Sequence, residues 1–413
     1  MAEKRERFIK LSRRSDTKWW AKALITLGAI VLAFLLCSFM ILIVNPSAYA
    51  DFYVYFYRGT MLNFGMILTN LKDSALLFLI AVALIPVFKM KYWNIGAEGQ
   101  CLMGALGAFI GMLFIAPHLP IVLAILVEVL LAVAFAVVWT IIPAIFKALF
   151  NANETLFTLM MNYIATGIVA AFVMANSNSG SGTIVSPWEN EHYGWLPQLP
   201  YFNDSYLVMI GIVLLVAAAI MVYMNYSKHG YELSVVGESQ NTARYVGINV
   251  RKVVLRTAVL TGAICGIVGF LIVAGANHTI SANAIAGNGF TAIIICWIGN
   301  FNVPLMAFYS ILIKFVSVGC DNAIAWTSGA VVISGMKSIS VALFFIVLII
   351  STFFINFRVI VKWPKWMLKV FAFFKKVFGP VGNFFKKIGA AVTNFFKKIF
   401  KKKNKTEEEV NNG

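Results

Sequence analysis

Charged residues are scarce in this sequence. They make up 12% of its 413 residues, whereas hydrophobic residues make up 60% and the mean hydropathy is +0.83. A water-soluble globule of this size needs far more polar surface, so the composition excludes one. Several apolar stretches have about the 20 residues that a helix needs to cross a membrane, namely Ala21–Val44, Ile121–Phe146, Tyr206–Met224 and Val341–Ile355. The sequence therefore predicts an all-α, polytopic helical membrane protein.

Sequence motifs for catalysis and for nucleotide binding are also lacking. The sequence has no G-x-x-x-x-G-K-[ST] motif, so the chain cannot cradle the phosphates of ATP by itself. Its four histidines are scattered without metal-ligand spacing, and no nucleophile–base set accompanies them. The five cysteines fall in or at the end of apolar stretches, which is typical of packing residues. We expect no enzyme activity, no metal and no cofactor on this chain.

Positive charge is concentrated at the two ends. Residues 1–24 hold eight Lys or Arg and three acids, and residues 361–413 hold thirteen Lys and three Glu. Because these basic segments flank membrane spans, the positive-inside rule explains them better than binding to nucleic acid does. We predict a basic cytoplasmic N-terminus (1–24), a transmembrane domain (25–360) and a cytoplasmic tail (361–413), with both termini inside.

The transmembrane domain has about ten predicted spans, which include Ser74–Val87 and Thr155–Ala175 besides the apolar stretches above. Two of its segments, Trp93–Gly107 and Gly287–Pro304, are punctuated by Gly and Asn within apolar sequence, and one lies in each half of the chain. Paired interrupted helices of this kind indicate inverted repeats with a binding site between them, because interrupted backbone at membrane depth must be buried or line a water-filled cavity. The alternative is that these glycines only let helices pack closely.

Polar residues at membrane depth are the candidate ligands of that site. Intramembrane polar groups are costly and usually face a cavity or a partner. The predicted substrate-binding residues are Asn94, Glu98, Gln100, Asn162, Asn288 and Phe290. Glu128 lies in the middle of a span, where a structural carboxyl is the slightly stronger interpretation. Amides, one carboxylate and aromatic rings such as Trp93 suit a neutral solute rich in hydroxyl groups.

A long internal loop, Gly230–Arg256, is the second candidate site. Within it the stretch Glu232–Val246 is compatible with a helix and ends at Gly247. A solvated loop would explain the mixed charge, but a helix between two spans favours a docking element for a cytoplasmic partner.

Four stretches of the sequence have a distinctive pattern, namely YWNIGAEGQCLMGA (92–105), NETLFTLMMNYIA (153–165), VVGESQNTARYVGIN (235–249) and GNGFTAIIICWIGNFNVP (287–304). They resemble the permease subunits of ABC importers of the nucleoside and simple-sugar family (ribose- and branched-chain-amino-acid-type). The resemblance covers residues 72–355, and NIGAEGQ is typical of the nucleoside branch. It implies that 25–360 is a permease domain in the cytoplasmic membrane and that nucleosides are the substrate, with simple sugars such as ribose as the alternative.

The same resemblance implies the partners. ATP and Mg²⁺ would be bound by a separate cytoplasmic ABC ATPase, and a second permease and an extracellular substrate-binding lipoprotein would complete the importer. In such permeases the internal loop supplies the helix that couples to the ATPase, and that role falls on Gly237, Glu238, Ala243 and Gly247. The rival hypothesis is an ion-coupled secondary transporter with Glu98 or Glu128 as a proton relay.

The tail lies outside the resemblance. Phe-Phe-Lys-Lys begins at residues 373, 384 and 395, and a repeat of eleven residues keeps each pair of rings on one helix face. We predict an amphipathic helix lying on membrane lipids, with its surface contacts made by Phe384, Lys386, Lys387, Phe395, Lys397 and Lys398. The alternative is a disordered tail that only fixes the topology.

Overall fold

The computed structural model describes residues 9–13, 18–44, 46, 49–177, 182–188, 191–199, 205–327 and 335–361. The chain divides into two units, one comprising residues 1–25 and 352–413 and the other residues 26–351. In the first unit, β1 (Ile9–Arg13) pairs antiparallel with β4 (Phe357–Val361). The second unit contains the predicted sites in the transmembrane domain and internal loop, whereas the predicted tail helix lies outside the described residues.

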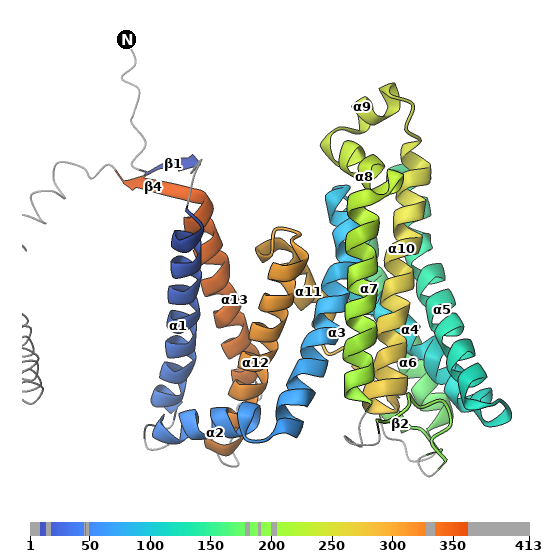
Figure 1. Ribbon diagram of the computed structural model, residues 1–413, viewed down its shortest axis with the longest axis horizontal. Coiled ribbons are helices and arrows are strands. Elements are labelled where there is room, and N and C mark those ends of the chain that lie inside the picture. Colours follow the sequence, from blue (N-terminus) through green and yellow to red (C-terminus); the bar gives the residue numbers. More distant parts are fainter. Residues whose placement is uncertain are drawn as a thin grey trace, which may run out of the picture. The chain divides into compact units, whose positions relative to one another are not determined.

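Helices dominate the described part of the chain (Figure 1). In chain order they are α1 (Trp19–Val44), α2 (Tyr49–Met61), α3 (Phe64–Lys89), α4 (Ala97–Phe114), η2 (Ala116–His118), α5 (Ile121–Phe150), α6 (Glu154–Asn176), α7 (Tyr206–Tyr226), α8 (Lys228–Glu238), α9 (Gln240–Tyr245), α10 (Val250–Phe270), the π-helical segment η3 (Leu271–Asn277), α11 (Asn288–Ile298), α12 (Val303–Thr327) and α13 (Gly335–Asn356). Two short strands, β2 (Thr183–Val185) and β3 (Thr279–Ser281), pair antiparallel.

The prediction of an all-α polytopic membrane protein is confirmed. Among the described residues, eight helices are long and apolar enough to cross a membrane, and two further apolar helices, Asn288–Ile298 and Ala342–Ile355, are shorter. The expected spans at 155–175 and 206–224 correspond to α6 and α7.

Two elements near the N-terminus differ from expectation. α3 begins at Phe64, ten residues before the predicted start at Ser74, because Lys72 stays in the helix by pairing with Asp73 at 3.1 Å and lying over the ring of Tyr206. α2 was not predicted at all. It has 13 residues and runs across the direction of α3 and α12 (Figure 1), so it is too short to span a membrane.

Small residues let α4, α5 and α10 pack closely in the core of the second unit. A Cβ atom on Gly266 of α10 would lie 2.7 Å from the carbonyl oxygen of Ala132 in α5, and one on Gly104 of α4 would lie 2.8 Å from the Cα of Gly266. Close backbone approach through small residues is the usual way in which membrane helices associate. The packing interpretation therefore holds for Gly104, which lies inside the segment predicted to be interrupted.

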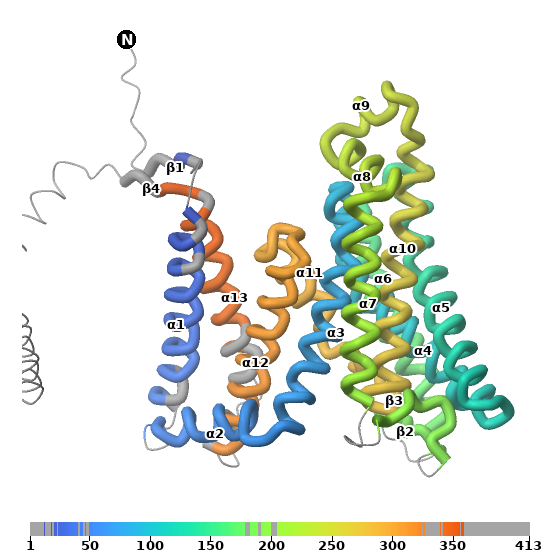
Figure 2. Tube along the Cα trace, in the orientation of Figure 1, coloured from blue at the N-terminus to red at the C-terminus, as the bar shows by residue number. Residues whose placement is uncertain are grey.

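The two ends of the second unit carry different elements. α8 and α9 lie at one end, whereas β2 and β3 lie at the opposite end (Figures 1 and 2). At the strand end, the π-helical turn leaves two carbonyl oxygens that accept bonds from the long loop. The backbone N–H of Leu196 donates to Ala274, and the Ser205 hydroxyl donates to Gly275 at 2.6 Å.

Candidate functional site

The first predicted interruption is confined to residues 92–96, between α3 and α4, because α4 is a continuous helix from Ala97. The amides of Asn94 and Gln100 bond each other in both directions at 3.2 Å, and the Asn94 oxygen also accepts from the backbone N–H of Gly96 at 2.9 Å. Both side chains are buried. These two predicted ligands therefore stabilise the non-helical backbone.

α6 completes this network from the other side. The Asn162 amide donates to the carbonyl of Ile95 and accepts from the N–H of Gly99, each at 2.9 Å. The N–H of Ile95 donates to the hydroxyl of Thr158 at 3.1 Å. Three of the predicted residues, Asn94, Gln100 and Asn162, are thus brought together, and Thr158 joins them although sequence reasoning did not select it.

Glu98 connects this segment to the second half of the chain. Its carboxylate accepts from the backbone N–H of Gly287 at 2.8 Å and from that of Gly289 at 2.7 Å. Gly287 has φ +77°, a left-handed conformation that glycine adopts without steric cost, and it immediately precedes α11. The carboxylate therefore satisfies the free N–H groups at the start of α11, where negative charge is favoured.

A lysine that sequence reasoning missed belongs to the same cluster. Lys314, in the middle of α12, donates to the side-chain oxygen of Asn288 at 2.8 Å. Glu98, Asn288 and Lys314 thus join α4, α11 and α12. The signal was present, since a lone Lys within the apolar run 303–318 is costly in a membrane unless it has a partner.

Aromatic rings form the exposed surface beside these polar groups. Phe290, Ile294 and Trp297 follow one another on one face of α11, and Phe290 is 41% exposed. The indole of Trp297 stacks on that of Trp93, with centroids 5.2 Å apart and planes at 11°, yet the two side chains remain 44% and 46% exposed. Of the six predicted ligands, Phe290 is the one with a largely open side chain.

Glu128 does not join this cluster. Its side chain is fully buried in α5, against Gly111 of α4 and Gly194 of the long loop. Within the described residues, neither of its carboxylate oxygens has a hydrogen-bond partner. The structure therefore places the two intramembrane carboxyls in different environments.

The predicted docking helix is two helices. Ser239 adopts an extended conformation after α8, and its hydroxyl accepts from the N–H of Thr242 at 3.2 Å, so it caps α9. The single helix expected over Glu232–Val246 is therefore wrong, because a capping serine begins a new helix. Gly247, with φ +81°, follows the end of α9.

The four predicted coupling residues lie on this element in different environments. Gly237 packs so closely on α3 that a Cβ atom would overlap the carbonyl oxygen of Lys89. Ala243 is buried, whereas Glu238 and Gly247 are exposed. Large side chains beside them also point outward, with Tyr231 68% and Tyr245 93% exposed.

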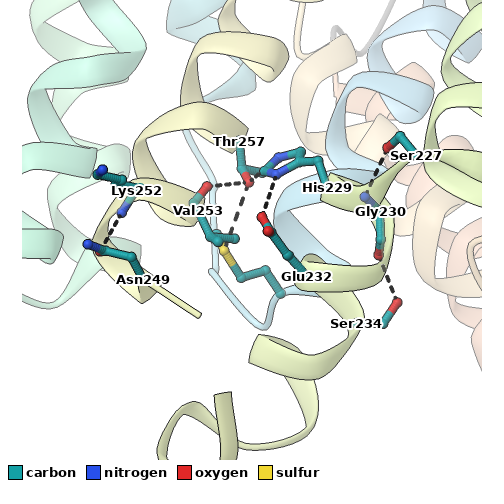
Figure 3. Close-up of polar contacts among 10 residues, drawn as sticks. Ser227, His229, Gly230, Glu232, Ser234, Asn249, Lys252, Val253 and Thr257 are labelled. Atoms are coloured by element: carbon teal, nitrogen blue, oxygen red, sulfur yellow. Dashed lines mark hydrogen bonds and ion pairs between the residues drawn. The ribbon is translucent and has the colours of Figure 1, made fainter. Parts of the chain in front are cut away.

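His229 holds the base of α8 against two other elements (Figure 3). Its Nε2 lies 3.3 Å from the hydroxyl of Thr257 in α10, and that hydroxyl also contacts the sulfur of Met90, just after α3, at 4.0 Å. Burial, followed by the charge of Arg256, lowers the pKa of His229 below its usual value. The ring is therefore neutral near pH 7, as a buried packing contact requires.

The described part of the chain contains no group of three His, Cys, Asp or Glu that could hold a metal ion. All five cysteines are buried and free of disulfides, as expected for packing residues. The predicted membrane-surface residues Phe384, Lys386, Lys387, Phe395, Lys397 and Lys398 lie outside the described residues.

Comparison with known proteins places these features in context. Residues 66–356 match the family described as branched-chain amino acid transport system / permease component. A guanosine ABC transporter permease of Bacillus subtilis is 28% identical over 72% of this chain and 86% of that protein. A glucose ABC transporter permease of Haloferax volcanii is 26% identical over 68% of this chain and 76% of that protein. A nucleoside ABC transporter permease of Lactococcus lactis is 24% identical over 73% of this chain and 84% of that protein.

Proposed function

Because the chain belongs to the family of branched-chain amino acid transport system permease components, we propose that it is the membrane-spanning subunit of an ABC importer for nucleosides. It is a multi-pass transport subunit of the plasma membrane and not an enzyme. Family membership favours the ATP-driven importer over the ion-coupled carrier that the intramembrane carboxyls also suggested.

The aromatic surface of α11 is the observation that supports a nucleoside. Trp93, Phe290 and Trp297 offer open ring faces on which a planar base stacks, and such stacking contributes about 1–3 kcal/mol per base. Asn288, at the start of the same helix, supplies a polar side chain for a sugar. The predicted amides Asn94, Gln100 and Asn162 hold the backbone of 92–96 in place behind this surface. Two relatives are named for nucleoside or guanosine transport.

A monosaccharide is the second candidate substrate, favoured by the glucose permease among the relatives. A sugar also packs on aromatic faces, but it has no planar base that could stack on the indoles of Trp93 and Trp297.

The α8–α9 element is the proposed docking site of the cytoplasmic ATPase, which binds ATP and Mg²⁺. Gly237 and Ala243 pack inward and fix the element on the membrane helices, while Glu238, Tyr231 and Tyr245 face outward. Exposed tyrosines are typical anchors of protein interfaces. We therefore propose that the α8–α9 end lies in the cytoplasm, and the charge of the basic segments supports a cytoplasmic position for both termini as well.

The opposite end, with β2 and β3, then faces outward. It is the proposed docking site of the substrate-binding lipoprotein, and a second permease subunit completes the pathway. The long loop 176–205 contains no Lys or Arg, in keeping with an external position.

The test is uptake of tritium-labelled guanosine and of labelled glucose by the complete transporter in vesicles. Guanosine uptake that needs ATP, with little glucose uptake, is expected. Trp297→Ala should lower guanosine uptake about five- to 100-fold, which corresponds to the loss of one stacked base, whereas Trp297→Phe keeps a ring and should retain most of it. Preferred uptake of glucose, or equal uptake by the Ala and Phe variants, would overturn the nucleoside assignment.

A further inference from the structure

α11 is attached to one segment of the chain at both of its ends. At its start, the N–H groups of Gly287 and Gly289 bond the carboxylate of Glu98. At its end, Trp297 stacks on Trp93. Glu98 and Trp93 are five residues apart, so residues 93–98 hold a helix of 11 residues, about 16 Å long, like a bracket.

The attachment at Glu98 is built for close contact. A Cβ atom on Gly289 would lie 2.7 Å from the Cα of Glu98 and 2.8 Å from its Oε2, so only glycine fits there. The bonds from Gly287 and Gly289 are short and charge-assisted, which makes them stronger than bonds between neutral groups. Lys314 adds a third helix to the contact through Asn288 at 2.8 Å.

α8 contacts the chain just before this bracket, at the end of α3. The backbone of Gly237 packs on the carbonyl of Lys89, and Thr257 joins His229 of α8 to Met90. The ring of Phe88, in the last turn of α3, lies 6.2 Å from the ring of Trp93 and 6.1 Å from that of Trp297. A continuous set of contacts therefore runs from α8 through residues 88–98 to α11.

We propose that Glu98 is a positioning residue that makes α11 follow the α3–α4 connection when α8 moves, and that it does not itself bind the transported solute. Both of its oxygens accept from backbone N–H groups of α11, and Lys314 of α12 bonds the neighbouring Asn288. The inference rests on the proposed function in one respect, namely that α8 receives the movement of the ATPase. Without the carboxylate, ATP hydrolysis continues but α11 no longer follows.

Two alternative roles for Glu98 make different predictions. A ligand of the solute would change the selectivity between solutes that differ in one hydroxyl group. A residue needed only for folding would lower uptake and ATP hydrolysis together, leaving their ratio unchanged. A positioning residue changes the ratio of ATP hydrolysed to solute imported and leaves the selectivity as it was.

The experiment uses the complete transporter in vesicles with Glu98→Gln, Glu98→Ala and the control Asp73→Asn, which breaks the Lys72–Asp73 pair on α3. ATP hydrolysed per guanosine imported should rise about tenfold in Glu98→Gln, which keeps one acceptor oxygen and loses one charge-assisted hydrogen bond. It should rise further in Glu98→Ala, which loses both bonds, and should stay at the wild-type value in the control. The ratio of guanosine to 2′-deoxyguanosine uptake should be unchanged. An unchanged ATP ratio, or an altered guanosine preference, would overturn the proposal.

A second measurement does not depend on the solute. All five native cysteines are buried, so a cysteine introduced by Phe290→Cys reports the exposure of α11 to a water-soluble maleimide. ATP should change its labelling rate when Glu98 is present and should not when Glu98→Gln is added. An equal response to ATP in both backgrounds would contradict the positioning role. If wild-type transporter imports no guanosine, the proposed substrate fails while this labelling test still decides the role of Glu98.

Discussion

Replacing Gly237 by alanine tests the contact between α8 and the membrane helices. A Cβ atom at this position would overlap the carbonyl oxygen of Lys89 and lie 3.1 Å from its carbonyl carbon and 3.4 Å from the Cα of Met90. The atoms that it meets belong to the backbone of α3 and the following turn, which cannot move aside as a side chain can. α8 must therefore shift away from α3.

Two free energies of opposite sign decide the size of the effect. Overpacking of this kind costs about 1–3 kcal/mol, whereas replacing glycine by alanine inside a helix gains about 1 kcal/mol. The overlapped atoms are backbone, so the cost lies in the upper part of its range, at about 2–3 kcal/mol. The net weakening of the α8–α3 contact is then about 1–2 kcal/mol, which is about a 5- to 30-fold change in an equilibrium constant. We expect guanosine uptake by Gly237→Ala to fall by a similar factor while insertion into the membrane is normal.

The matched control is Gly211→Ala in the middle of α7, where a Cβ atom would meet nothing within 4 Å. It carries the same gain in helix propensity without the overlap, so uptake should be unchanged. The assays are uptake in vesicles, the amount of permease in the membrane and the amount of ATPase that co-purifies. Wild-type uptake and undiminished co-purification in Gly237→Ala would refute the coupling role of this contact.

Three further predictions follow from the other contacts. Gly289→Ala places a methyl group against Glu98 and should lower uptake about tenfold or more, and uptake as in wild type would show that α11 need not approach α4 so closely. Burial, followed by the charge of His192, lowers the pKa of His278 to about 4 from its ordinary 6.5. The neutral ring stacks on Trp195, so its stabilisation of the long loop should be complete above about pH 6.5 and should be lost as the pH falls through about 4. Hydrogen exchange of residues 182–199 should therefore accelerate on acidification, but not in His278→Phe. A peptide of residues 381–405 should become helical on anionic vesicles, and salt should weaken its binding to them. Removal of residues 362–413 from the full chain should lower uptake by no more than about twofold, since the tail contacts only the membrane surface.

The helices could be predicted from the sequence because the information that specifies them is local. A run of apolar residues must be helical inside a bilayer, where its backbone groups have no other partners. α6 and α7 therefore begin and end within about two residues of their expected limits. α2 was not predicted because its six aromatic residues are interspersed with polar ones, including Asp51 and Arg58, in a stretch too short to span a membrane. The break between α8 and α9 was not predicted, because a serine inside a helical pattern does not by itself indicate a cap. The cap is shown by the hydrogen bond from the N–H of Thr242 to the hydroxyl of Ser239.

For the candidate site, the sequence predicted which residues are involved but not which of them contact one another. Glu98 and Glu128 are both single carboxyls at membrane depth, and the sequence distinguishes them only by the Gly, Asn and Gln that surround Glu98. In the structure, what distinguishes them is the backbone that reaches each one. Glu98 meets N–H groups that lie 189 and 191 residues away along the chain, whereas Glu128 meets Gly194, which offers its side-chain oxygens no hydrogen bond in the described structure. Hydropathy and motif spacing describe a residue and its neighbours in sequence, so they cannot identify a hydrogen-bond partner that lies so far along the chain. The cost of an intramembrane charge therefore shows that a partner is needed, and only the fold shows that for Glu98 this partner is the first turn of α11.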